Sequence, residues 1–235
     1  MTTINGLADL RPGDIMFGPI GGAVGLGIGL GQLALGEGFH VGKLSIRHVG
    51  IVVEAATMAG AETIRSARLV QAMPRGAEEV PMRVEYAYGH GPSFWTPEHA
   101  YVRLPEDYPG QARDAAAIAR LMVAEHVAYS FASYAALAAW RWGLKAGRLG
   151  KWIERRRPLD PLDWPYGPPE RLPSGRPWDQ QLPVEAICSV LVDQAWSLAG
   201  KRVMRNVAHQ AVTPGAMAGQ LLTRPGAIWG GPAWG

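Results

Sequence analysis

Cysteine is almost absent from this sequence of 235 residues, which contains only Cys188. A single cysteine excludes a disulfide framework within the chain and a zinc site built from several cysteines. A large excess of charge is also lacking: 23 Lys and Arg residues stand against 20 Asp and Glu residues, leaving a net charge of +3 with His neutral. Because this surplus makes only a weak field over a whole domain, we expect no nucleic-acid partner.

Long hydrophobic runs are lacking as well. The most apolar stretch, 21–36, contains seven glycines and falls short of the roughly 18–20 residues that span a bilayer. The first residues, MTTINGLADLRPGD, have neither the basic start nor the apolar core of a secretory signal. We therefore expect no transmembrane segment and a cytoplasmic location, with association with a virion or export by a non-standard route as alternatives.

Short apolar and β-branched runs predict a set of strands, within a chain that is 48% apolar and contains 30 glycines and 19 prolines. The turn Pro74-Arg75-Gly76 separates two of these runs, and together they suggest an antiparallel meander. One expected strand directly follows the turn at 12–14. The others cover 48–54, 68–72, 80–84 and 99–104. Helical periodicity predicts three helices, which cover 111–125, 131–142 and 183–198. The sequence thus predicts one α+β domain over 1–235, with an antiparallel sheet or small barrel packed against helices.

Four segments fit neither pattern. The glycine-rich stretch 21–36 suits a closely packed helix or a surface loop, and propensity favours the loop. Residues 127–130 suit a loop with a helix cap at Ser130. Residues 150–182, rich in Pro, Trp and Arg, are expected to be an inserted loop or lid, and 224–235 an extended C-terminal arm.

Aromatic and basic side chains gather in and beside the 150–182 insertion. One interpretation is a wall that binds a glycan, peptide or lipid headgroup through stacking and cation–π contacts. The other, which we favour, is aromatic packing that ties a long loop to the body of the protein. The tryptophans concerned are Trp140, Trp142, Trp152, Trp164 and Trp178.

Cys188 falls near the start of the helix expected at 183–198, where the helix dipole favours a thiolate. A lone cysteine on an apolar helix is also common as a small core residue. A cysteine nucleophile needs a histidine base and a third polar group that orients the imidazole. His48 is the best candidate because it opens a strongly apolar strand, where a polar ring would face the sheet edge. The other histidines have no spacing typical of metal ligands and suit loop or surface positions; they are His40, His90, His99, His126 and His209.

Five short patches resemble one enzyme family when taken in order. They are LRPGDIMFG, IRHVGIVVE, RLVQAMPRGAEEVPM, AICSVLVDQAW and VTPGAMA. They are similar to the permuted papain-like branch of the NlpC-type cysteine hydrolases, and within that branch they resemble the YiiX-like amidases. In that branch the catalytic histidine precedes the cysteine, as His48 precedes Cys188 here. The resemblance implies a circularly permuted papain-like fold.

The resemblance also implies roles for individual residues. Cys188 matches the nucleophile and His48 the general base, while Gln71 stands where the family usually has Glu. A glutamine can fix the histidine tautomer, but it brings no charge to stabilise an imidazolium. Tyr129 and Ser189 are expected in the substrate pocket, and no metal or other cofactor is implied.

Three functions follow as hypotheses. The first is a cysteine peptidase or amidase that acts on peptidoglycan stem peptides, the substrate class that the resemblance implies. The second is a non-catalytic protein that keeps the fold in a phage tail or cell-envelope assembly. The third is a lipid acyltransferase or phospholipase, although the Asn-Cys-Glu-His segment of such relatives is replaced here by Ile187-Cys188-Ser189-Val190. Peptide, glycopeptide or lipid-amide substrates are the partners expected.

Overall fold

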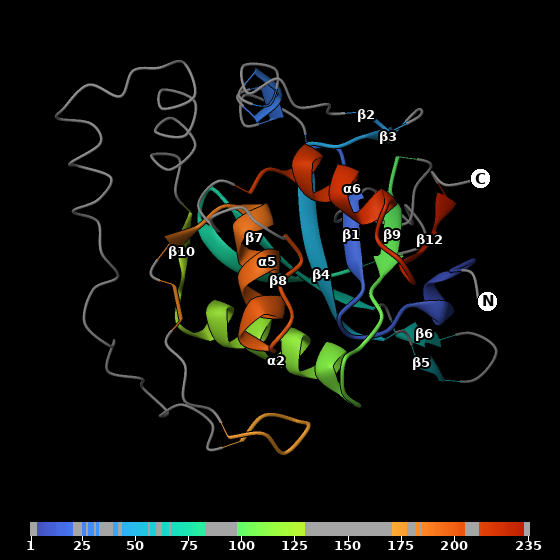
Figure 1. The fold of residues 1–235 in the computed structure, drawn as a ribbon, viewed down its shortest axis with the longest axis vertical. Coiled ribbons are helices and arrows are strands. Elements are labelled where there is room, and N and C mark those ends of the chain that lie inside the picture. Colours follow the sequence, from blue (N-terminus) through green and yellow to red (C-terminus); the bar gives the residue numbers. More distant parts are fainter. Residues whose placement is uncertain are drawn as a thin grey trace, which may run out of the picture.

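Six antiparallel strands form one open sheet in the order β12-β9-β1-β4-β7-β8 (Figure 1). They are β1 (Ile15–Gly18), β4 (His48–Glu54), β7 (Arg68–Met73), β8 (Gly76–Pro81), β9 (Ala100–Arg103) and β12 (Ile228–Gly230). The computed structural model describes residues 4–20, 25–26, 28–30, 32, 40–41, 44–55, 57–59, 63–65, 67–82, 98–129, 171–177, 182–183, 185–204 and 212–232. The expected α+β class is confirmed, and of the two expected forms of the sheet the open one is observed.

Shorter elements stand outside this sheet. Two antiparallel pairs lie beyond the ends of its strands (Figure 1), and one parallel pair joins distant parts of the chain. These pairs are β2 (His40–Val41) with β3 (Leu44–Ser45), β5 (Thr57–Ala59) with β6 (Thr63–Arg65), and β10 (Ala128–Tyr129) with β11 (Glu185–Ala186). A 3-10 helix, η1 (Leu7–Asp9), precedes β1.

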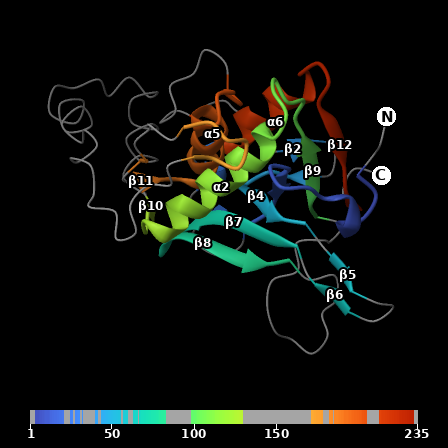
Figure 2. The ribbon, with the colours of Figure 1, turned by 90° about the horizontal axis from the view of Figure 1, so that it is seen from below.

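The helices α2 (Gln111–Ala124) and α5 (Cys188–Leu198) cover one face of the sheet (Figure 2). Buried residues of both helices share the main core cluster with Val49 and Ile51 of β4. A second cluster on the opposite face joins Val52 and Leu69 to η1 and its flanking residues. The helix α6 (Pro214–Leu222) lies near the end of the sheet where β4 begins. Because β4 is buried on both faces, its run of apolar β-branched residues was a clear signal in the sequence.

The strand after the turn at Pro74 begins earlier than expected. It starts at Gly76 and ends at Pro81, whereas the sequence suggested 80–84. A two-residue turn, with Gly76 at φ +115°, returns the chain directly into pairing with β7. β8 is an edge strand, so its charged residues can face solvent, and this composition hid its first half.

The meander is also only partly correct. β4, β7 and β8 follow one another in the sheet, but β9 pairs with β1 instead of β8. On its other edge β9 pairs with β12, so the segment expected to be an extended arm contributes an edge strand. Trp229 of β12 is buried and stacks on Phe17, with 5.4 Å between ring centroids.

Two expected local structures differ near the candidate nucleophile. The helix expected from Pro183 begins at Cys188, because β11 occupies Glu185–Ala186. Gly200, with φ +89°, ends this helix as expected. The loop expected over 127–130 contains β10, which pairs with β11 in parallel.

Other sequence-based expectations meet the described residues only in part. Within 21–36, residues 25, 26, 28–30 and 32 are helical, so the loop favoured for this stretch is wrong there. Of the insertion, 171–177 and Leu182 are described. The helix expected over 131–142, its cap at Ser130 and the five tryptophans of the aromatic cluster lie outside the described residues.

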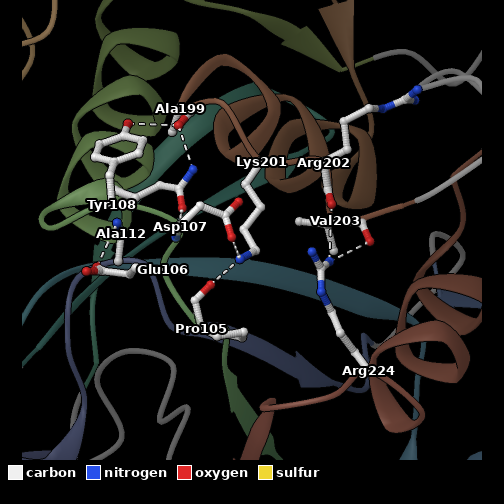
Figure 3. A network of polar contacts seen from close by, with 11 residues as sticks. Pro105, Glu106, Asp107, Tyr108, Ala112, Ala199, Lys201, Arg202, Val203 and Arg224 are labelled. Carbon is white, nitrogen blue, oxygen red and sulfur yellow. Dashed lines mark hydrogen bonds and ion pairs between the residues drawn. The ribbon is translucent and has the colours of Figure 1, made fainter.

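A polar network fixes the C-terminal end of α5 against the start of α2 (Figure 3). Tyr108 Oη donates to the carbonyl of Ala199 over 2.8 Å, and Gln111 Nε2 donates to the same oxygen over 2.9 Å. Lys201 Nζ bonds Asp107 at 2.6 Å and also donates to the carbonyl of Pro105. This anchoring holds one end of α5 and thereby the direction in which its first residue, Cys188, points.

Candidate functional site

Cys188 is the first residue of α5, and its side chain has no exposed surface. The backbone N–H groups of Val49, Ser189 and Cys188 itself donate toward the sulfur, which favours a thiolate. Burial acts in the opposite direction and is the larger effect, raising the pKa of the thiol from 9.0 to about 11. In this structure the cysteine is therefore a protonated thiol at neutral pH.

His48 opens β4 and pairs with Gly18 of β1. Its side chain is 3% exposed, and its Nε2 lies 2.7 Å from Oε1 of Gln71. Burial lowers the pKa of His48 from 6.5 to about 4, and the hydrogen bond to Gln71 offsets only part of this effect. The imidazole is therefore neutral at pH 7.

Gln71 connects His48 to a carboxylate on the next strand. Its Nε2 donates to Oε1 of Glu78 over 2.7 Å. An ionised carboxylate only accepts hydrogen bonds, so the amide nitrogen must face Glu78 and the amide oxygen must face His48. His48 then carries its proton on Nε2, and Nδ1 keeps a free lone pair. Nδ1 is buried and has no hydrogen-bond partner among the described residues.

The sulfur of Cys188 contacts the backbone N–H of Val49, the residue that follows His48 in β4. No hydrogen bond joins the thiol to Nδ1 of His48. Cys188 shares the main core cluster with Val49, on the face of the sheet covered by α2 and α5. Because side chains alternate along a strand, His48, Gln71 and Glu78 belong to the opposite face. The structure thus brings His48 to Gln71 and the backbone next to Cys188, and leaves the cysteine–histidine contact unmade.

Tyr129 and Ser189, both expected in a substrate pocket, lie close to the sulfur in different ways. Tyr129 is half-buried in β10, and burial together with the charge of a Cys188 thiolate raises the pKa of its phenol. The hydroxyl of Ser189 is buried and donates to the carbonyl of Val212 over 2.6 Å. That hydroxyl is engaged in the core, so Ser189 meets the sulfur through its backbone N–H.

Sequence reasoning missed Glu78 and His99. The turn at Pro74 contained the signal for Glu78, since a two-residue hairpin at 74–75 places 71 directly opposite 78. His99 was expected in a loop or at the surface, yet it is 7% exposed. Burial and the nearby His48 lower the pKa of His99 to about 4. Its neighbourhood depends on the pairing of β9 with β1, for which the sequence offers no local signal.

The remaining histidines contribute no described side chain to this region. His126 is exposed at the end of α2, with φ +53°, in agreement with the surface role expected for it. The side chain of His40 and all of His90 and His209 fall outside the residues that the structure describes.

Within the described ranges, no cluster of three or more His, Cys, Asp or Glu side chains could hold a metal ion. Nor does any helix found there have the length and apolar character required to cross a membrane.

Comparisons with family models, with curated proteins and with solved structures found no match to this chain. The five sequence patches and the geometry around Cys188 and His48 are therefore the basis for assigning a function.

Proposed function

We propose that the protein is a cysteine hydrolase of the permuted papain-like type that cleaves amide bonds, with peptidoglycan stem peptides as its substrate class. One observation carries the proposal: the hydrogen bonds of Gln71 leave Nδ1 of His48 unprotonated, and His48 is one residue from the backbone N–H that binds the Cys188 sulfur. The His-before-Cys order and the position of Cys188 at the start of a helix support the same fold and chemistry.

The chemistry is acyl transfer to sulfur. Nδ1 of His48 takes the thiol proton, and the Cys188 thiolate attacks the carbonyl carbon of an amide to give a tetrahedral oxyanion. The oxyanion collapses to a thioester as the C–N bond breaks, and the imidazolium returns its proton to the leaving amine. Water, deprotonated by His48, then adds to the thioester, and its collapse releases the acid and the thiol.

The start of α5 is suited to stabilise the oxyanion. N–H groups in the first turn of a helix have no partner within that helix, and the helix dipole adds a partial positive charge there. The N–H groups of Cys188 and Ser189 already point toward the sulfur. An oxyanion formed on the carbon that the sulfur attacks would lie beside these donors. The electrostatic effect of Cys188 on the Tyr129 phenol supports a place for Tyr129 in the proposed pocket.

The proposed reaction requires a rearrangement on substrate binding. Nδ1 must come within hydrogen-bond reach of the sulfur, and the buried thiol must reach a carbonyl. His48 is the first residue of β4 and pairs with Gly18 of β1, so this end of the strand has to open for the imidazole to reach the side of the sheet that holds the sulfur. Catalytic hydrogen bonds commonly shorten when substrate binds.

The test is hydrolysis of purified muropeptides by the full chain, with release of new amines as the readout. Cys188→Ala and His48→Ala should each abolish turnover, whereas His126→Ala, which changes an exposed histidine, should leave it unchanged. Assays of the same variants with phospholipid vesicles test the lipid hypothesis. Cys188-dependent release of fatty acid would identify a lipid, and not a peptide, as the substrate. No Cys188-dependent turnover of either substrate would refute the hydrolase proposal.

A second candidate is a non-catalytic component of a virion or cell-envelope assembly. The complete burial of Cys188 and the unmade contact with His48 favour it. A structural role predicts that Cys188→Ala changes neither assembly nor the release of amines from muropeptides, since alanine fills most of the same space. Loss of hydrolysis in that variant would exclude this candidate.

A further inference from the structure

The structure assigns to Glu78 a positioning role: through the amide of Gln71, its carboxylate holds His48 in the Nε2–H tautomer that leaves Nδ1 free to act as a base. The catalytic part of this assignment rests on the proposed function. The part that says Glu78 fixes the tautomer of His48 does not depend on it. In the cysteine hydrolase family that the sequence resembles, a glutamate usually stands at the position of Gln71. Here the negative charge lies on Glu78 of the neighbouring edge strand, β8.

The contact between Glu78 and Gln71 follows from the register of the hairpin. The two residues pair directly across β7 and β8, and so share one face of the sheet with their side chains side by side. The hairpin turn pairs Met73 with Gly76 and thereby sets every pair above it. The 2.7 Å hydrogen bond is therefore built into the backbone pairing, and needs no long-range packing.

A glutamine amide has no intrinsic orientation toward an imidazole. It can accept from Nε2–H through its oxygen, or donate to a bare Nε2 through its nitrogen, and each choice selects one tautomer. Glu78 removes this freedom because its carboxylate accepts the amide N–H. The second orientation would place the amide oxygen against the carboxylate, two acceptors with no proton between them. Only the arrangement with a free Nδ1 allows the Gln71 amide to make both of its hydrogen bonds, one to His48 and one to Glu78.

The neighbouring carboxylate, Glu79, supplies a matched control. It lies on the opposite face of β8, where Arg68 bonds it at 2.5 Å and Arg120 at 2.9 Å. Glu78 and Glu79 thus have the same side chain on the same edge strand, and one of the two contacts Gln71. A change that acts through the net charge or stability of β8 would appear in variants of both residues.

Three variants test the assignment: Glu78→Gln, Glu79→Gln and the exchange Gln71→Glu/Glu78→Gln. The exchange keeps composition and shape but places the carboxylate directly on Nε2–H of His48, with an amide behind it. Long-range proton–nitrogen correlation spectra of the imidazoles, with the His48 signals identified by their loss in His48→Gln, report the tautomer of His48 without any substrate.

We expect the wild type, Glu79→Gln and the exchange to show one protonated nitrogen, Nε2, and one bare nitrogen, Nδ1. Glu78→Gln should give nitrogen signals averaged between the two tautomers and lower kcat by about 10- to 100-fold with little change in KM, as is typical when a residue acts through another. The exchange should keep the single tautomer and raise the pKa of His48 above that of the wild type.

Unchanged nitrogen signals in Glu78→Gln would overturn the assignment, and so would a mixture of tautomers in the exchange. If Glu78→Gln does not fold, the exchange decides alone, because it restores both hydrogen bonds. The proposed function fails separately: a tautomer held by Glu78 without Cys188-dependent hydrolysis would retain the hold and refute the hydrolase. Conversely, hydrolysis with His48 signals indifferent to Glu78 would retain the hydrolase and refute the assignment.

Discussion

Gly18 of β1 pairs directly with His48 of β4. The ring of His99 occupies the space that a Cβ of residue 18 would fill. A Cβ built on Gly18 would lie 2.7 Å from Nε2 and 3.2 Å from Cγ of His99. The glycine thus allows a second buried imidazole to lie close to the candidate base, on the other side of one strand.

We therefore expect Gly18→Ala to displace His99 and to lower the free energy of unfolding by about 1–3 kcal/mol, the usual cost of overpacking. Urea denaturation measures the loss. The control is Gly219→Ala in α6, where a Cβ would have no neighbour within 4 Å and alanine favours the helix. Equal stability of Gly18→Ala and wild type would show that the His99 ring does not occupy that space.

The two buried histidines predict a loss of stability in mild acid. The pKa values of His48 and His99 are about 4 in the folded protein and 6.5 for an ordinary histidine, so between these values the unfolded chain binds protons that the native protein does not. Stability is therefore full above pH 6.5 and falls as the pH drops toward 4. Each histidine contributes at most about 3 kcal/mol to this loss.

Urea denaturation at pH 7, 6, 5 and 4.5 measures the dependence. His99→Gln should flatten the slope over this range, because one of the two groups no longer titrates. His126→Gln, which changes an exposed histidine, should leave the slope as it is. A stability independent of pH between 7 and 4.5 would contradict the burial of both neutral imidazoles.

The sequence was informative where local pattern decided the structure. The strand from His48 to Glu54 was predicted at its full length because burial on both faces requires an uninterrupted apolar run. Gln71 was placed beside His48 by resemblance, and the 2.7 Å contact agrees with that placement. Glu78 could also have been found, since the hairpin register follows from the length of its turn.

The sequence was uninformative where distant segments pair. Nothing near His99 shows that β9 lies beside β1, so its position next to His48 could not be derived. The start of α5 was misplaced for a related reason. Glu185–Ala186 is held in a strand by its parallel partner Ala128–Tyr129, more than fifty residues earlier in the chain, and this tertiary pairing overrides the helical pattern.

A buried ion pair at the start of β1 predicts a large effect from a small change. Asp14 is 2% exposed and bonds Arg103 at 2.6 and 2.8 Å. Burial raises the pKa of Asp14, while Arg103 acts to lower it. Asp14→Asn removes the only negative charge bonded to Arg103 among the described residues and leaves its guanidinium with the carbonyl of Asp9, so we expect a loss of about 3–5 kcal/mol in unfolding free energy.

Glu54→Gln is the control for this prediction, since the side chains of Glu54 and its partner Arg120 are 46% and 41% exposed. Arg120 also keeps its bonds to Glu79, so the expected cost stays below about 1 kcal/mol. Similar losses in the two variants, measured by urea denaturation at pH 7, would show that burial does not strengthen the Asp14 pair.

The thiol of Cys188 should react slowly while the protein is folded and free of substrate. Its pKa of about 11 lies two units above the ordinary 9.0, so near neutral pH the thiolate is about 100-fold scarcer than in a free cysteine, and burial slows access further. We expect alkylation by iodoacetamide at pH 7.5, monitored by the mass of the intact protein, to be at least about 100-fold slower in the folded protein than in the urea-unfolded chain.

His48→Ala should not change the rate of alkylation, because no hydrogen bond joins His48 to Cys188. Addition of a muropeptide should accelerate labelling if binding brings Nδ1 to the sulfur, and Cys188→Ala should take up no label. Fast alkylation of the free folded protein that depends on His48 would mean that a thiolate–imidazolium pair already exists, which contradicts the neutral pair described above.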